Sequence, residues 1–405
     1  MRQTDRYAAD SPSQPSATLQ RGVMGRWPAL DGVRGLAILL VMLEHTHLAP
    51  FHGGGLGVDL FFVLSGFLIS GLLLAEFQRS RGLDIRRFYY RRALRLLPAL
   101  LVLVAVTTGL ALAYHGEVGR ATLAMAPKTV FYVANLGRTD VGNPSLLAHT
   151  WSLSIEEQFY LVWPLLLLLL LRSRLSVRTL VGVVLAFAGL TTVTRTVSYL
   201  TGPDTSEHFG RWYFRTDTKV DAQLLGCTIA LLLASELPGT RWIARLPIGA
   251  IGLASFLALL AVVPWVDPGR TAFMVQMSAF RLASAGLILA FVLGRRSRSR
   301  LERAFEMRWL RFTGVLSYSL YLWHFPVFAL AQHQFGRSLK SLVVELPITL
   351  LLAYGSYRLV ERPFLRARER LSSTQQEPAV RGELATLAEA GAAAGGRPRG
   401  APWIP

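Results

Sequence analysis

Ten apolar segments, separated by short arginine-rich stretches, run through most of the sequence. A helix needs about 20 apolar residues to cross a bilayer. The segments, each of that length or nearly so, are residues 29–49, 55–77, 96–114, 154–171, 178–199, 219–234, 246–264, 272–294, 310–332 and 340–360. Hydrophobic residues make up 52% of the chain and charged residues 17%, whereas about 25% charged is typical of soluble domains. The sequence therefore predicts an all-α fold, a polytopic membrane bundle of about ten transmembrane helices, and excludes a soluble enzyme.

The basic residues are distributed unevenly between the two ends of these segments. Lysine and arginine together number 43 against 25 acidic residues, and only three of the 43 are lysines. With a cytoplasmic N-terminus, 31 of them fall on the cytoplasmic side and nine outside, as the positive-inside rule requires, and the remaining three, Arg34, Arg195 and Arg281, fall within spans. A nucleic-acid-binding protein would gather its basic residues on one polar face, so no nucleic-acid partner is expected. We expect a multi-pass protein of the cell membrane, embedded in the lipid bilayer, with both termini cytoplasmic.

A single membrane domain, residues 27–370, is expected between two polar tails. Residues 1–26 and 371–405 have compositions typical of disordered segments, and the first contains no recognisable cleavable signal peptide. The single cysteine, Cys227, excludes an intramolecular disulfide and a cysteine-based metal cluster. We therefore expect no metal site and no permanently bound cofactor.

The first apolar segment carries two ionisable side chains that share one helical face. Arg34 and His45 are 11 residues apart, which places them within about 20° of each other around a helix and about 16 Å apart along it. Ionisable groups within a span are costly and usually line a polar cavity. The alternative is that Arg34 snorkels to the surface and His45 lies in the headgroup layer. We favour a cavity with a guanidinium near its inner end and an imidazole near its outer end.

Three arginines, Arg91, Arg92 and Arg95, lead into the third apolar segment from the cytoplasmic side. A guanidinium binds phosphate oxygens through two parallel hydrogen bonds, so such a cluster at a helix entrance suits a phosphorylated ligand. The same residues could instead serve only to orient the helix in the membrane. The charge pattern by itself leaves both interpretations open.

Several polar side chains are expected in the outer half of the bundle, at about the depth of His45. Glu156 and Glu157 enter with the fourth segment, among aromatic side chains. A pair of carboxylates in such surroundings favours a function beyond stabilising a helix N-terminus. Further supporting residues are Asp59, Trp151, Lys219, Asp221 and His324. Of these, Asp221 is expected at a solvated loop end, and His324 as a structural hydrogen-bonding group.

Several of these stretches resemble motifs of the acyltransferase family 3 membrane proteins. The stretches that carry the resemblance are residues 30–35 together with His45, and residues 57–69, 88–98, 150–160, 317–326 and 360–363. They follow the order of the family over about residues 27–366. Some members of the family carry a further hydrolase-like domain, and none is expected after residue 370.

The resemblance implies an integral-membrane O-acyltransferase. Such an enzyme takes an acyl group from cytoplasmic acyl-CoA and transfers it to a hydroxyl group of a cell-envelope polysaccharide or, in some relatives, of a glycosylated metabolite such as a macrolide. The family's functional residues correspond to His45 as the catalytic histidine, Arg34 as the first-helix arginine, Arg91, Arg92 and Arg95 as the arginine cluster, and Glu156 as the carboxylate.

Two mechanisms fit these residues, and a second class of function remains open. In direct transfer, the arginines hold the CoA phosphates and His45 takes the proton of the acceptor hydroxyl. Glu156, or alternatively Asp59, would then orient the imidazole. In the other mechanism, the acyl group passes through an acyl-histidine intermediate. The alternative class is a proton-coupled transporter or a lipid flippase without acyl transfer, although no internal repeat is evident.

The distribution of basic residues makes the topology testable. A reporter domain fused after residue 140 should be found outside the cytoplasm, and one fused after residue 300 inside it, because 31 of the basic residues then lie in cytoplasmic regions. Reporter activity and protease accessibility measure both positions. The reverse result at either position would contradict this topology.

Overall fold

The computed structural model describes the fold of residues 27–46, 53–113, 116–138, 142–173, 175–203, 205–234, 246–266, 270–294, 299–337 and 339–367. Within these ranges every regular element is helical, which confirms the all-α prediction. The two tails expected at residues 1–26 and 371–405 lie outside the described residues.

The main helices follow one another along the chain with short connections. They are α2 (Pro28–His45), α3 (Gly57–Ser80), α4 (Ile85–Ala113), α5 (Glu117–Val130), α6 (Trp151–Arg172), α7 (Val177–Thr201), α8 (Ser206–Tyr213), α9 (Val220–Ala234), α11 (Ile248–Val262), α12 (Arg270–Leu293), α13 (Arg300–Phe305), α14 (Arg308–Val315), α15 (Ser317–Phe335) and α16 (Leu339–Ser356). Short 3₁₀ turns at Gly54–Leu56, Ala148–Thr150 and Val263–Trp265 precede or follow helices, and a π-helical turn, Tyr357–Glu361, extends α16.

Six helical stretches in the described part of the chain are long and apolar enough to cross a membrane. They contain α3, α4, α6, α7, α12 and α16, and a seventh span results if α14 and α15, bent by 74° at their junction, are counted together. The remaining three predicted segments do form helices, but α9 and α11 have only 15 residues each. The third, α2, contains three charged residues within 18. A helical membrane protein is thus confirmed, with fewer long apolar spans than the predicted ten.

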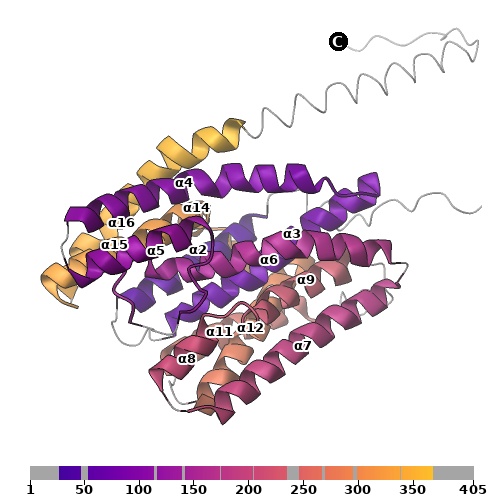
Figure 1. Cartoon of the computed structure of the whole chain (residues 1–405). Helices are drawn as coiled ribbons and strands as arrows, with labels where there is room; N and C mark the ends of the chain where they lie inside the picture. Colours follow the sequence, from indigo (N-terminus) through magenta and orange to yellow (C-terminus); the bar gives the residue numbers. More distant parts are fainter. Residues whose placement is uncertain are drawn as a thin grey trace, which may run out of the picture.

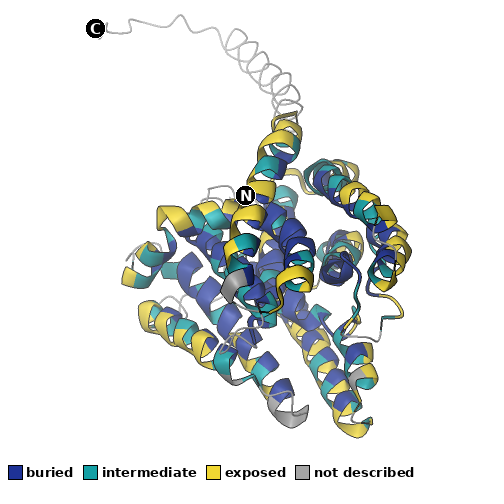
Figure 2. Ribbon diagram, turned by 90° about the vertical axis from the view of Figure 1, so that its left-hand side faces the viewer, coloured by how far each residue is buried: buried dark blue, intermediate teal, exposed yellow. Residues whose placement is uncertain are grey.

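The helices differ in how much of their surface the bundle covers. In the most apolar window of α3, 78% of the residues are buried, against 28% in α4 and in α7. Figure 1 shows α4 along one side of the molecule and α7 along the opposite side, with α2, α3 and α6 between them. Figure 2 shows exposed residues along the outer helices, and many exposed residues of the described chain are large and apolar. This arrangement is typical of a bundle in which α3 is central and the peripheral helices contact lipid.

Two glycines let α3 and α9 approach until their backbones touch. A Cβ atom added to Gly66 would lie 2.0 Å from the carbonyl oxygen of Gln223, and one added to Gly226 would lie 1.9 Å from that of Val63. Helices in membranes associate through such small residues, because close backbone approach replaces the hydrophobic driving force that lipid does not supply. The contact therefore fixes the position of the central helix.

Replacing either of these glycines by alanine should destabilise the bundle. Gly66→Ala and Gly226→Ala are each expected to cost about 1–3 kcal/mol, because the added methyl group forces the two backbones apart. Gly189→Ala on α7 is the matched control, since a Cβ there meets no heavy atom within 4 Å. The control should leave stability unchanged or raise it slightly, because alanine is the better helix former. Thermal unfolding of the detergent-purified protein measures all three, and equal melting temperatures would contradict the contact.

Candidate active site

Two cavities lie along α2, and Arg34 and His45, which the sequence placed on one face of that helix, line different ones. The arginine cavity, of about 200 Å³, is lined by Arg34. The histidine cavity, of about 870 Å³, is lined by His45. The structure therefore places the two residues on one helix but in separate cavities, which differ in size and in chemistry.

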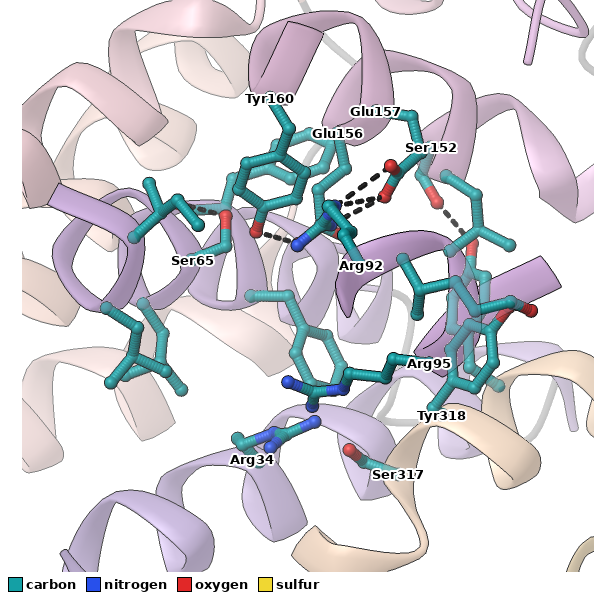
Figure 3. Close-up of a pocket in the computed structure, with 18 of the residues that line it drawn as sticks. Arg34, Ser65, Arg92, Arg95, Ser152, Glu156, Glu157, Tyr160, Ser317 and Tyr318 are labelled. Atoms are coloured by element: carbon teal, nitrogen blue, oxygen red, sulfur yellow. Dashed lines mark hydrogen bonds and ion pairs between the residues drawn. The ribbon is translucent and has the colours of Figure 1, made fainter. Parts of the chain in front are cut away.

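The arginine cavity brings together side chains from α2, α3, α4, α6 and α15 (Figure 3). Arg92 forms a two-pronged ion pair with Glu157, with Nη2–Oε1 and Nε–Oε2 distances of 2.5 and 2.9 Å. Its guanidinium also lies 3.1 Å from the centre of the Tyr160 ring. The charge of Arg92 is thus matched within the protein. Arg91, which sequence analysis grouped with it, does not line this cavity.

Arg34 and Arg95 differ from Arg92 in lacking such a partner. Figure 3 shows their guanidinium groups pointing toward one another across the cavity. Among the described residues neither group takes part in an ion pair or hydrogen bond; the nearby carboxylate of Glu156 instead accepts a 2.5 Å hydrogen bond from the Tyr160 hydroxyl. Two unpaired guanidiniums that face each other repel, and an anion placed between them removes the repulsion and fills their donors. The arrangement can therefore bind an anionic group.

His45 lies at the end of α2, where a backbone carbonyl holds its ring. Its Nδ1 is 2.7 Å from the carbonyl oxygen of Val41. A carbonyl can only accept a hydrogen bond, so Nδ1 carries the proton and Nε2 keeps a free lone pair. Gln332 on α15 donates to the backbone carbonyl of His45, at 2.7 Å, and ties this end of α2 to the bundle. The ring is therefore oriented and in the tautomer that a general base requires.

The expected contact between Glu156 and His45 is not formed. Glu156 lines the arginine cavity, and no described carboxylate forms a hydrogen bond or ion pair with the His45 ring. The reason lies in where α6 begins. The sequence placed the span at residue 154, but the helix starts at Trp151 and follows a 3₁₀ turn. Glu156 therefore lies five residues, about 7.5 Å along the axis, after the start of the helix, whereas the predicted start would place it two residues, about 3 Å, after it.

Two further histidines surround His45. The His324 ring is centred 5.0 Å from that of His45, and the His149 ring 5.5 Å from that of His324. His324 bonds the carbonyls of Leu320 and Tyr321 through Nδ1, at 3.1 and 2.8 Å, and its buried Nε2 has no hydrogen-bond partner in the described part of the chain. Sequence analysis singled out His324 but not His149, although His149 directly precedes the stretch 150–160 that carries the family resemblance.

Two residues, Val58 and Tyr321, line both cavities. The Tyr321 hydroxyl donates to the carbonyl of His149 at 2.8 Å and lies 2.5 Å from the hydroxyl of Ser152. Ser152 lines the arginine cavity and His149 the histidine cavity. The Tyr321 side chain therefore stands at the boundary between the two cavities, held by one hydrogen-bond partner from each.

Three of the expected supporting residues belong to a buried charge cluster instead of to either cavity. The cluster consists of Asp59, Arg195, Lys219, Asp221 and Arg281, which come from α3, α7, the start of α9, and α12. Asp221 is 3% exposed, so its expected place at a solvated loop end is wrong. Sequence analysis also missed Arg195 and Arg281 as its partners, because ion pairs this distant in sequence leave no local pattern.

The cluster is connected through Arg281. Its guanidinium lies 2.6 Å from Asp59 Oδ1 and 2.6 Å from Asp221 Oδ1. Arg195 pairs with Asp221 at 2.7 Å, and Lys219 lies 3.5 Å from Asp59. None of the five side chains lines the arginine or the histidine cavity. They hold helices together, and neither Asp59 nor Asp221 reaches the His45 ring.

Trp151, the remaining expected supporting residue, forms part of the wall of the histidine cavity. Its ring packs against those of Tyr213 and Phe214, with centres 5.2 and 5.1 Å away. Lys219 reaches this wall from behind, with Nζ 4.0 Å from the centre of the Tyr213 ring. The charge cluster thus supports the cavity wall through a cation–π contact.

Comparisons with known proteins show which family and which proteins this chain is similar to. A family model described as "Acyltransferase domain" matches residues 27–358. The peptidoglycan O-acetyltransferase OatA of Listeria monocytogenes is 31% identical over 352 residues, which cover 83% of this chain and 55% of that protein. The O-acetyltransferase OatA of Staphylococcus aureus is 32% identical over 354 residues, covering 83% and 57%.

The putative peptidoglycan O-acetyltransferase YrhL of Bacillus subtilis is 33% identical over 350 residues, covering 83% of this chain and 54% of that protein. The chain therefore spans about half the length of the curated relatives it matches. No solved structure matches it.

The ion pair between Arg92 and Glu157 should be visible as a coupling between the two residues. Arg92→Ala leaves a largely buried carboxylate without its partner, which costs more than removing both charges. We expect Arg92→Ala to lower the melting temperature by several degrees, and Arg92→Ala/Glu157→Ala to recover at least half of that loss. Arg91→Ala serves as the control and should leave it unchanged. Strictly additive losses in the double variant would contradict the pairing.

Proposed function

The chain belongs to acyltransferase family 3, and from this membership we propose that it is a membrane O-acyltransferase that transfers an acetyl group from cytoplasmic acetyl-CoA to a hydroxyl group of a cell-envelope glycan. Two of the similar proteins support this acceptor class by their names, one a peptidoglycan O-acetyltransferase and the other a putative one. The observation that carries the proposal is the pair of adjoining cavities. One offers unpaired guanidiniums for an anionic donor, and the other offers an imidazole with a free lone pair for the acceptor.

The arginine cavity is the proposed donor site. Its volume of about 200 Å³ lies below the range of about 300–1,000 Å³ that is usual for ligands of drug size. It can therefore receive part of a CoA molecule, with an anionic group between Arg34 and Arg95 and the acyl arm directed toward Tyr321. Glu156, which bonds Tyr160 in this cavity, belongs to the donor side in this proposal. Arg92 shapes the site through Glu157 and does not supply a free charge.

The histidine cavity is the proposed acceptor site. Its volume of about 870 Å³ suits a ligand of several rings. Aromatic side chains line much of it, among them Trp151, Tyr213 and Phe325, and Arg138 adds a cation. Apolar walls with a few polar groups are typical of sites that bind and orient organic ligands.

His45 acts as the general base in the proposed reaction. Its Nε2 takes the proton of the acceptor hydroxyl while that oxygen forms a bond to the thioester carbonyl carbon. The carbon–sulfur bond then breaks, and the leaving thiolate of CoA receives the proton from the imidazolium. The carbonyl of Val41 orients the ring and stabilises its charged form through Nδ1, in the place that a carboxylate takes in a triad.

Loss of His45 should stop transfer without loss of donor binding. With acetyl-CoA and a soluble peptidoglycan fragment as substrates, we expect His45→Ala to lower the rate of CoA release about 10²–10⁴-fold, the usual contribution of a general base. His45→Gln should fail equally, because an amide cannot take up the proton. Dissociation constants for CoA should remain unchanged in both, since His45 does not line the donor cavity.

The donor site supplies the complementary comparison. Arg34→Ala and Arg95→Ala should each weaken CoA binding by about 1.5–3 kcal/mol, the contribution of a hydrogen bond to a charged group, whereas the control Arg91→Ala should bind normally.

Other outcomes would change the proposed reaction. If an acetylated macrolide were the sole product, the acceptor would be a macrolide and not a glycan. An accumulated acetyl-enzyme that depends on His45 would favour the acyl-histidine mechanism. Wild-type protein that releases no CoA but moves protons or lipid would instead identify a transporter or flippase.

A further inference from the structure

His149 is a buried histidine whose ring nitrogens are poorly satisfied in the described part of the chain. It is 3% exposed, neither Nδ1 nor Nε2 has a hydrogen-bond partner of ordinary geometry there, and the backbone of Leu322 lies near enough to interact with the ring. The residue lines the histidine cavity beside His45. Buried polar groups in proteins are nearly always hydrogen-bonded, so two unfilled nitrogens at a cavity wall indicate that a ligand or solvent completes them.

The imidazole of His149 is held by contacts of its ring face and by hydrogen bonds to neighbouring backbone carbonyls. Because these contacts do not use the ring nitrogens, the nitrogens remain available to a ligand. It stacks on Phe325, with ring centres 5.0 Å apart and an angle of 21° between the planes. The Tyr321 hydroxyl donates to its carbonyl at 2.8 Å, and Arg138 donates to the carbonyl of the preceding residue, Ala148. A side chain held in this way from several directions is preorganised for binding.

The other two histidines each use one ring nitrogen to bond the protein backbone. His45 and His324 both use Nδ1 to bond carbonyls of their own helices. No hydrogen bond connects any two of the three rings in the described structure, so they do not form a continuous path for a proton. His149 is therefore placed to contact a ligand directly and does not act through His45.

We propose that His149 is a second acceptor-binding residue, which forms a hydrogen bond with a hydroxyl group of the glycan next to the one that is acylated. A neutral imidazole has one donor and one acceptor nitrogen, so it can bind a hydroxyl in either sense. Its place in the same cavity as His45 makes the site selective for acceptors with two neighbouring polar groups over simple alcohols. The inference rests on the proposed function and adds the specificity of its acceptor site.

The test compares two acceptors in one enzyme. His149→Phe keeps the stacking ring and removes both nitrogens. With acetyl-CoA as donor, we expect this variant to raise KM for a soluble peptidoglycan fragment about tenfold, the effect of losing one hydrogen bond. Acetylation of 1-propanol, which has a single hydroxyl, and the KM for acetyl-CoA should remain unchanged. A purely structural role would change all of these together.

Two conservative variants locate the nitrogen that matters. The amide of Asn reaches about the position of Nδ1 and that of Gln about the position of Nε2, so one of His149→Asn and His149→Gln should restore the KM for the glycan and the other should not. This pair also decides the matter if His149→Phe fails to fold. His333→Phe, at an exposed position on α15, is the control and should behave as wild type.

The outcomes separate the two proposals. Wild-type protein that transfers no acetyl group to any acceptor would overturn the proposed function itself. Active wild-type protein together with an unchanged glycan KM in His149→Phe would overturn the role of His149 alone. Equal KM values for Asn and Gln would overturn it as well, as would a loss of 1-propanol acetylation that matches the loss with the glycan.

Discussion

The guanidinium of Arg281 connects three helices in the interior of the bundle. It bonds Asp59 on α3 and Asp221 on α9 from its own position on α12, and Asp221 in turn bonds Arg195 on α7. Charges so deeply buried are tolerated only when their partners satisfy them, because desolvation would otherwise outweigh their attraction. The cluster carries one more positive than negative charge. The ring of Tyr213 stabilises the ammonium group of Lys219 through a cation–π contact. The cluster adds to the glycine contacts that pack α3 against α9, and through Lys219 it supports the wall of the histidine cavity.

The interior arginines of the described chain fall into two classes, those that are paired with a carboxylate and those that are free to bind a ligand. Arg92 and Arg281 each have a carboxylate at 2.6 Å or less, so their charges are used within the protein. Arg34 and Arg95 face each other without such a partner in the described part of the chain. Position in the sequence does not separate these classes, since Arg92 and Arg95 lie within one helical turn of each other. What separates them is whether a carboxylate from another helix comes within reach.

The positions of the helices could be predicted from the sequence, but the ion-pair partners of buried residues could not. The predicted segments 55–77 and 178–199 correspond to α3 (Gly57–Ser80) and α7 (Val177–Thr201), because lengths of apolar chain directly determine spans. The place of Arg34 and His45 on one helical face followed from spacing alone. Arg281 and Asp59, by contrast, are 222 residues apart, and no pattern within a helix reveals such a pair.

Depth was the other weak point of the prediction. Because α6 starts three residues earlier than predicted, Glu156 lies about 4.5 Å further along the helix, and it lines the arginine cavity. Hydropathy gives the ends of a span only approximately. The carboxylate contact expected for His45 is not formed in the described structure, and the backbone carbonyl of Val41 is the group that bonds its ring.

The boundary formed by Val58 and Tyr321 also affects how the membrane keeps its electrical potential. A membrane holds its potential only while no continuous aqueous path crosses it, and an ion that enters a low-dielectric interior without water loses its hydration energy. The two cavities are separate, and the Tyr321 side chain stands between them with its hydroxyl bonded to Ser152 and His149. An acetyl group is small and uncharged, so it can pass a boundary of one side chain that hydrated ions cannot. In the proposed reaction, the same ring would keep the membrane sealed while the neutral acetyl group passes between the two cavities.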